Sequence, residues 1–137
     1  MKSRSELTVE KRENGYNCAQ AIACTYCDLV GMDEVTLFKL TEALGGGMGN
    51  AEDTCGAIIG ACILAGLVNS SGNLQSPNSK ASTAKLSREI MRRFQERNRA
   101  VTCKALKGIE TGKVLRSCPD CIRDASEFAE DILFKEK

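Results

Sequence analysis

The chain has 137 residues, and its apolar fraction of 42 % and charged fraction of 27 % are ordinary for one globular domain. A formal net charge of +1, with four Phe, two Tyr and no Trp, argues against a nucleic-acid surface, which usually combines excess basic charge with aromatic platforms. Histidine is absent, which excludes His-ligated zinc, Cys–His nucleophile pairs and Ser–His–Asp triads.

The first part of the chain predicts three helices, over residues 5–14, 18–30 and 34–44. No stretch shows the long β-branched alternation that is typical of strands. The helix ends are marked by residues that commonly stop or cap helices, namely Gly15, Asn17, Gly31 and Asp33.

A glycine-rich segment follows at residues 45–50. It should not be helical, because each glycine is about 1 kcal/mol less favourable than alanine in a helix. We expect a loop whose backbone comes close to a neighbouring group. Asp53 or Thr54 then caps the most apolar helix, residues 55–68, which we expect at the centre of the fold. Small residues at a four-residue spacing should let another helix pack closely on it: Gly56, Ala57, Gly60 and Ala61.

Residues 70–79 are typical of a surface linker. An amphipathic helix with one basic face is predicted over residues 80–100, and a short helical turn over residues 103–107. Pro119 stands where a first helical residue belongs, which predicts a last helix over residues 120–135.

These elements predict an all-α fold: a compact single-domain bundle of five to six helices over residues 1–137, with the apolar helix in the middle. The longest apolar stretch, residues 57–68, is about a dozen residues, against roughly 20 needed to span a bilayer. Residues 1–15 lack the apolar run of a signal peptide. We therefore expect a cytoplasmic protein with no membrane span and no nucleic-acid partner, and leave homodimerisation open.

Cysteine is the informative residue type. There are eight cysteines: Cys18, Cys24, Cys27, Cys55, Cys62, Cys103, Cys118 and Cys121. In the cytoplasm thiols stay reduced unless they are catalytic, redox-sensing or bound to a metal. Three of them stand at predicted helix N-termini, where partial positive charge favours a thiolate: Cys18, Cys55 and Cys118. Cys118 and Cys121 also form a C-x-x-C pair, which suits a dithiol couple or two metal ligands. The pattern predicts core or surface thiols at Cys24, Cys27 and Cys62.

Five separated motifs occur in an order that resembles the C-GCAxxG-C-C family of redox-active proteins. They are GYNCAQA at 15–21, the glycines at 45–49, CGAIIGA at 55–61, Cys103, and Cys118 with Pro119. The resemblance covers nearly the whole chain. It implies that the family's four named cysteines correspond to Cys18, Cys55, Cys103 and Cys118, and selenoprotein members imply a reactive thiol position. This chain places a glycine after Cys55, whereas the family name places it before, and Cys121 lies outside the four.

The leading hypothesis is thiol redox chemistry by these four cysteines, brought together by the fold. It assigns the attack to Cys55 and the resolving step to Cys118 or Cys18, and it needs no cofactor. Supporting positions are expected at Gly46, Gly47, Gly49, Gly56 and Cys121. The substrate or redox partner stays unknown. Two alternatives remain open: a Cys₄ site for an Fe–S cluster or zinc, and a structural or interaction protein with incidental cysteines.

Overall fold

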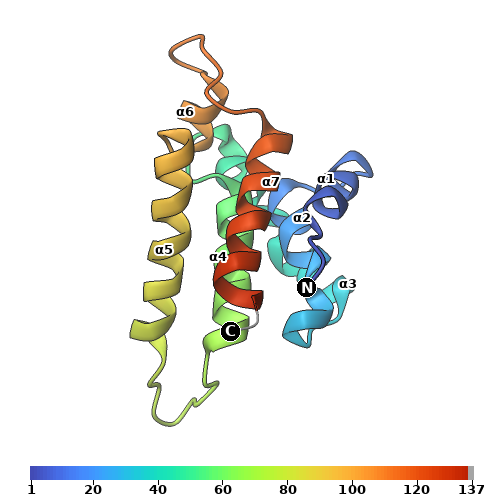
Figure 1. Ribbon diagram of the computed structural model, residues 1–137, viewed down its shortest axis with the longest axis vertical. Coiled ribbons are helices and arrows are strands. Elements are labelled where there is room, and N and C mark those ends of the chain that lie inside the picture. Colours follow the sequence, from blue (N-terminus) through green and yellow to red (C-terminus); the bar gives the residue numbers. More distant parts are fainter. Residues whose placement is uncertain (136–137) are drawn as a thin grey trace.

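The computed structural model describes residues 1–135 and confirms the all-α fold (Figure 1). Its α-helices are α1 (Ser5–Glu13), α2 (Cys18–Thr25), α3 (Glu34–Thr41), α4 (Gly56–Asn69), α5 (Lys80–Asn98), α6 (Cys103–Lys107) and α7 (Cys118–Ala129). Single turns of other helical types are η1 (Cys27–Val30), η2 (Glu42–Leu44), η3 (Gly47–Ala51) and η4 (Glu130–Phe134). Met48 and Gly49 inside η3 have positive φ values, so the glycine-rich segment is not a regular helix, as predicted. None of the described helices is long and apolar enough to cross a bilayer.

The central position predicted for the most apolar helix is confirmed. α4 lies between α2, α5 and α7, as Figure 1 shows, and contacts all three. A helix that is apolar on nearly every face is stable only where neighbours cover it on several sides. The core side chains that α4 contributes are Ala57, Ile58, Ala61, Leu64 and Ala65.

Several helix boundaries differ from the predicted ones. α2 ends at Thr25 instead of residue 30, and the separate turn η1 leads to Gly31, whose φ of +69° suits glycine. The N-cap of α4 is Cys55 itself, not Asp53 or Thr54. α7 begins two residues earlier than predicted, at Cys118, because Ser117 accepts a hydrogen bond from the backbone N–H of Asp120 and caps the helix there.

α2 and α4 pack unusually closely where α4 carries glycine. A Cβ atom at Gly60 would lie 2.8 Å from the carbonyl oxygen of Ala19 and 2.9 Å from Cβ of Ile22. No side chain fits in that space, so glycine allows the two backbones to meet. This contact brings the beginnings of α2 and α4 together.

We predict that Gly60→Ala destabilises the fold by about 1–3 kcal/mol, because the added methyl group overpacks the α2–α4 contact. Urea unfolding followed by circular dichroism measures this change. Gly66→Ala is the matched control on the same helix, since a Cβ there meets nothing within 4 Å. It should be neutral or stabilising by up to about 1 kcal/mol. Equal effects at both positions would contradict the packing argument.

Candidate active site

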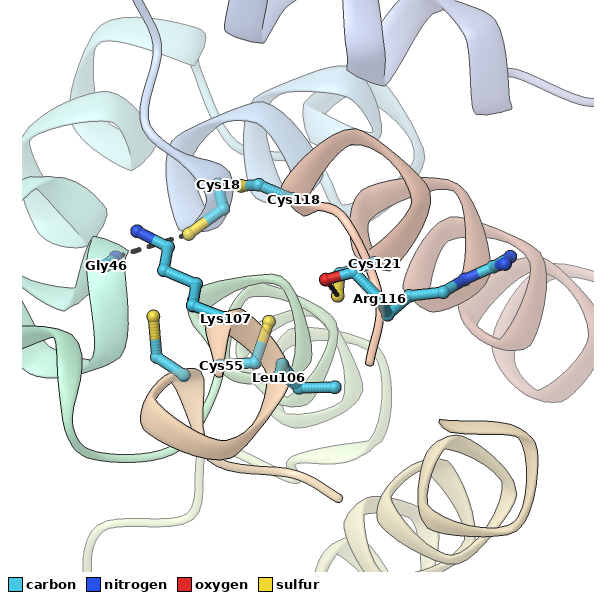
Figure 2. Close-up of a pocket in the computed structure, with 10 residues that line it drawn as sticks. Cys18, Gly46, Cys55, Leu106, Lys107, Arg116, Cys118 and Cys121 are labelled. Carbon is cyan, nitrogen blue, oxygen red and sulfur yellow. Dashed lines mark hydrogen bonds between the residues drawn. The ribbon is translucent and has the colours of Figure 1, made fainter. Parts of the chain in front are cut away.

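Five cysteines surround a small cavity at the end of the bundle where α6 and the start of α7 lie (Figures 1 and 2). The cavity measures about 30 Å³, enough for a water molecule. Its lining residues are Cys18, Gly46, Cys55, Gly56, Cys103, Leu106, Lys107, Arg116, Cys118 and Cys121. This cavity therefore brings together all four cysteines assigned from the sequence and three of the supporting positions, Gly46, Gly56 and Cys121.

Each of the four assigned cysteines stands at the start of a different helix. Cys18, Cys103 and Cys118 are the first residues of α2, α6 and α7, and Cys55 is the N-cap of α4. The first backbone N–H groups of a helix have no partner inside the helix and carry partial positive charge. The fold thus gathers four such ends around the sulfur atoms, which favours thiolate over thiol.

A short antiparallel backbone pairing joins the segments that carry Cys55 and Cys103. Thr54 and Thr102 face one another in an isolated β-bridge. The N–H of Cys55 donates to the carbonyl of Val101 at 2.8 Å, and the N–H of Cys103 donates to the carbonyl of Asp53 at 2.7 Å. These two bonds hold the start of α6 beside the start of α4.

The glycine segment borders the cysteines, as the sequence suggested. The N–H of Gly46 donates to Sγ of Cys18 at 3.3 Å (Figure 2). Gly47 has a φ of +61°, and a Cβ there would lie 2.6 Å from Cβ of Cys103. Gly49 does not line the cavity, and a Cβ on it would meet nothing within 4 Å. Gly46 and Gly47 therefore contact the site, whereas Gly49 only shapes the loop.

Cys18 and Cys118 form the first of two thiol pairs (Figure 2). The hydrogen bond from the Cys18 thiol, supported by the Arg12 guanidinium, lowers the pKa of Cys118 to about 6. Nε of Arg12 donates to Sγ of Cys118 at 3.2 Å. Donation to Cys118, together with burial, raises the pKa of Cys18. At neutral pH this pair therefore consists of a Cys118 thiolate and a Cys18 thiol.

Cys55 and Cys121 form the second pair, deeper in the core. The interaction with the Cys121 thiol, together with the backbone N–H groups of Ala57 and Ile58, lowers the pKa of Cys55 against the opposing effect of burial. The same interaction and burial raise the pKa of Cys121, whose thiol donates to the carbonyl oxygen of Arg116 at 3.9 Å. The two pKa values are thus shifted in opposite directions, as in the first pair.

The fifth cavity cysteine, Cys103, differs from both pairs. Burial raises its pKa, and the nearby Lys107 ammonium opposes this effect only in part. Figure 2 shows the Lys107 side chain extending toward Cys18 and Gly46. Lys107 is exposed at the cavity and has no ion-pair partner among residues 1–135.

The other three cysteines lie outside the cavity. Burial raises the pKa of Cys24 and of Cys62 to about 11, and it also raises the pKa of Cys27. Thiols of this kind are poor nucleophiles at neutral pH. Within the described part of the chain, no group of three or more Cys, Asp or Glu side chains is placed to hold a metal ion.

Sequence reasoning missed three basic residues of the site, Arg12, Lys107 and Arg116. Arg12 lies more than a hundred residues from the thiolate that it contacts, and no local motif marks it. The guanidinium of Arg116 points away from the cavity in Figure 2 and is held by Asp124, at 3.0 and 3.1 Å. Asp124 is buried and also accepts hydrogen bonds from Arg97 and Asn98, so it fixes the segment that leads into α7.

Fold and site together define a small all-α protein with a cluster of thiols whose pKa values are shifted in opposite directions. The family model described as "Putative redox-active protein (C_GCAxxG_C_C)" matches residues 16–132. The chain belongs to this redox-active family, which confirms the resemblance seen in its motifs. No curated protein and no solved structure matches the chain.

We predict that Arg12→Gln raises the pKa of Cys118, because the thiolate loses its cationic partner. The hydrogen bond from Cys18 remains, so the rise should be partial. The measurement is the pH dependence of iodoacetamide labelling at Cys118, read by peptide mass spectrometry. Labelling at pH 6.5 should slow several-fold. Arg88→Gln, at an exposed position on α5, is the control. An unchanged labelling midpoint in Arg12→Gln would show that Arg12 is not the partner.

We also predict that Gly56→Ala disturbs the first thiol pair. A Cβ at Gly56 would overlap Sγ of Cys18 and lie 3.0 Å from the Cα atom of Gly45. The Cys18 sulfur must then shift, which disturbs its hydrogen bond with Cys118, so the labelling midpoint of Cys118 should rise. Gly66→Ala again serves as the control, because it adds the same methyl group to α4 at a position with open space. A Cys118 midpoint equal to that of the unaltered protein would refute this packing role.

Proposed function

We propose that this protein exchanges thiols with disulfides, with Cys118 as the attacking thiolate and Cys18 as the resolving thiol. The observation that carries the proposal is the first thiol pair, in which a thiolate held by Arg12 accepts a hydrogen bond from a second thiol. This is the arrangement that the reaction needs, since one sulfur must be ionised to attack and the other must be near enough to resolve. Membership of a redox-active family supports the same conclusion.

Access favours Cys118 over Cys55 as the attacking residue. Among the five cavity cysteines, Cys118 alone is partly exposed, whereas Cys55 is only 6 % exposed. An attacking thiolate must be both ionised and reachable by the substrate. The assignment of the attack to Cys55 from sequence rested on ionisation alone, and burial could not be read from the local pattern.

The proposed reaction has two steps. Cys118 attacks one sulfur of a substrate disulfide, which breaks that bond and releases the first substrate thiolate to take up a proton. The Cys18 thiol then loses its proton and attacks Sγ of Cys118, which releases the second substrate thiolate. The substrate gains two electrons and becomes two thiols, and the protein loses two electrons and gains one disulfide. A dithiol reductant reverses these changes and restores the pair.

The surroundings of the cavity suit this chemistry. Arg12 and Lys107 place positive charge near the sulfur atoms, and no carboxylate lines the cavity among the described residues. Positive charge stabilises both the attacking thiolate and the thiolate that leaves. A cytoplasmic location belongs to this proposal, because reducing conditions keep the pair in its thiol form between turnovers.

The test is the reaction of the fully reduced protein with glutathione disulfide, followed by acid quenching, alkylation and peptide mapping. We expect a Cys18–Cys118 disulfide in the unaltered protein. In Cys18→Ser the resolving thiol is gone, so a mixed disulfide with glutathione should be found on Cys118 at early quench times. In Cys118→Ser both products should be lost. Cleavage on the amino side of Asp120 separates Cys118 from Cys121 for this assignment.

Cys62→Ser is the matched control, because Cys62 is a partly buried thiol that does not line the cavity. It should behave like the unaltered protein. The proposal fails if glutathione in Cys18→Ser is found on another cysteine while Cys118 stays free. It also fails if no disulfide joins Cys18 to Cys118.

A further inference from the structure

Cys121 is the cavity cysteine that the four-cysteine pattern leaves without a role. It is 2 % exposed, it lines the same cavity as the other four, and it lies in the same core cluster as Cys55. Its thiol donates to the carbonyl oxygen of Arg116 at 3.9 Å. Its position three residues after Cys118, near the start of α7, brings it into the core beside the start of α4. Figure 2 shows Cys121 facing the cavity from the side of α7.

We propose that Cys55 and Cys121 form a second dithiol, which takes over the disulfide first made at Cys18 and Cys118. This inference rests on the thiol–disulfide exchange proposed above. The protein then has two connected dithiols. The partly exposed pair, Cys18 and Cys118, reacts with the substrate, and the buried pair, Cys55 and Cys121, becomes oxidised when it reduces the first pair. The substrate of the buried pair is the protein's own Cys18–Cys118 disulfide.

The arrangement of the cavity supports transfer between the pairs. Cys18 lies directly against Gly56, the residue after Cys55, where even a Cβ atom would overlap its sulfur. Cys55 and Cys118 line the same cavity of about 30 Å³, and the Cys118 sulfur is near enough to raise the pKa of Cys55. A disulfide bond between Cys18 and Cys118 would therefore form beside the Cys55 sulfur. Cys103 lines the same cavity, but unlike Cys18 and Cys121 it has no thiol among the described residues as a hydrogen-bond partner, so we assign it no step.

The transfer is balanced within the protein. The Cys55 thiolate attacks Sγ of Cys118, which breaks the Cys18–Cys118 bond and releases Cys18 as a thiolate. The Cys121 thiol then attacks Sγ of Cys55, and Cys118 leaves as a thiolate. The proton given up by Cys121 goes to Cys18. Cys55 and Cys121 are oxidised by two electrons, and Cys18 and Cys118 are reduced by two.

Exhaustive oxidation of the full-length protein by glutathione disulfide tests this inference. We expect two disulfides per chain in the peptide map, Cys18–Cys118 and Cys55–Cys121, with the other four of the eight thiols still open to alkylation after unfolding. In Cys121→Ser one of the two disulfides should be lost, which halves the glutathione released from four molecules per chain to two. Cys62→Ser, with its thiol outside the cavity, should keep both disulfides.

A double variant tests the transfer itself. Without either resolving thiol, Cys18→Ser with Cys121→Ser should trap a Cys55–Cys118 disulfide. If Cys18–Cys118 forms in the unaltered protein while Cys55 and Cys121 stay alkylatable, the second dithiol is refuted and the proposed function stands. If Cys18–Cys118 does not form, the proposed function itself fails. The peptide map of the unaltered protein decides between these outcomes even if a variant does not fold.

Discussion

The close approach of α2 to α4 is the constraint on which the rest of the site depends. Gly56 and Gly60 remove the side chains that would hold the two helices apart, so the backbones meet where both helices begin. The sulfur of Cys18 then occupies the space that a side chain at position 56 would fill. Without this contact, the N-termini of α2 and α4 could not share one cavity.

The C-terminal half of the chain supplies the other cysteines at this end of the bundle. The pairing of Thr54 with Thr102 places α6 beside α4, and the packing of α7 on α1 and α4 brings Cys118 and Cys121 to the cavity. Asp124 reinforces this by holding Arg116, just ahead of α7, through two hydrogen bonds. Four segments far apart in sequence are therefore positioned by backbone hydrogen bonds, a buried carboxylate and apolar packing, independently of any bond between sulfur atoms.

Burial and charge act against one another in this cavity, and their balance differs among the thiols. Burial raises the pKa of every cavity cysteine, because a charged sulfur loses solvation. Hydrogen bonds from neighbouring thiols reverse this for Cys55 and Cys118, and the Arg12 guanidinium adds to the effect at Cys118. The five cavity thiols thus divide into two whose pKa values are lowered, Cys55 and Cys118, and three whose pKa values are raised, Cys18, Cys103 and Cys121.

The amino-acid pattern by itself determined the all-α fold, the central apolar helix, the glycine loop beside the cysteines and the placement of Cys18 and Cys118 at helix starts. These follow from local physics: periodicity, capping residues and the backbone freedom of glycine act over a few neighbouring residues. Only the tertiary structure decided which thiols lie side by side, that Arg12 contacts Cys118, and that Cys55 is buried whereas Cys118 is partly exposed. These features depend on contacts between segments that lie up to about a hundred residues apart in the sequence. Packing of the whole bundle sets how these segments are arranged, so no local sequence pattern predicts the contacts.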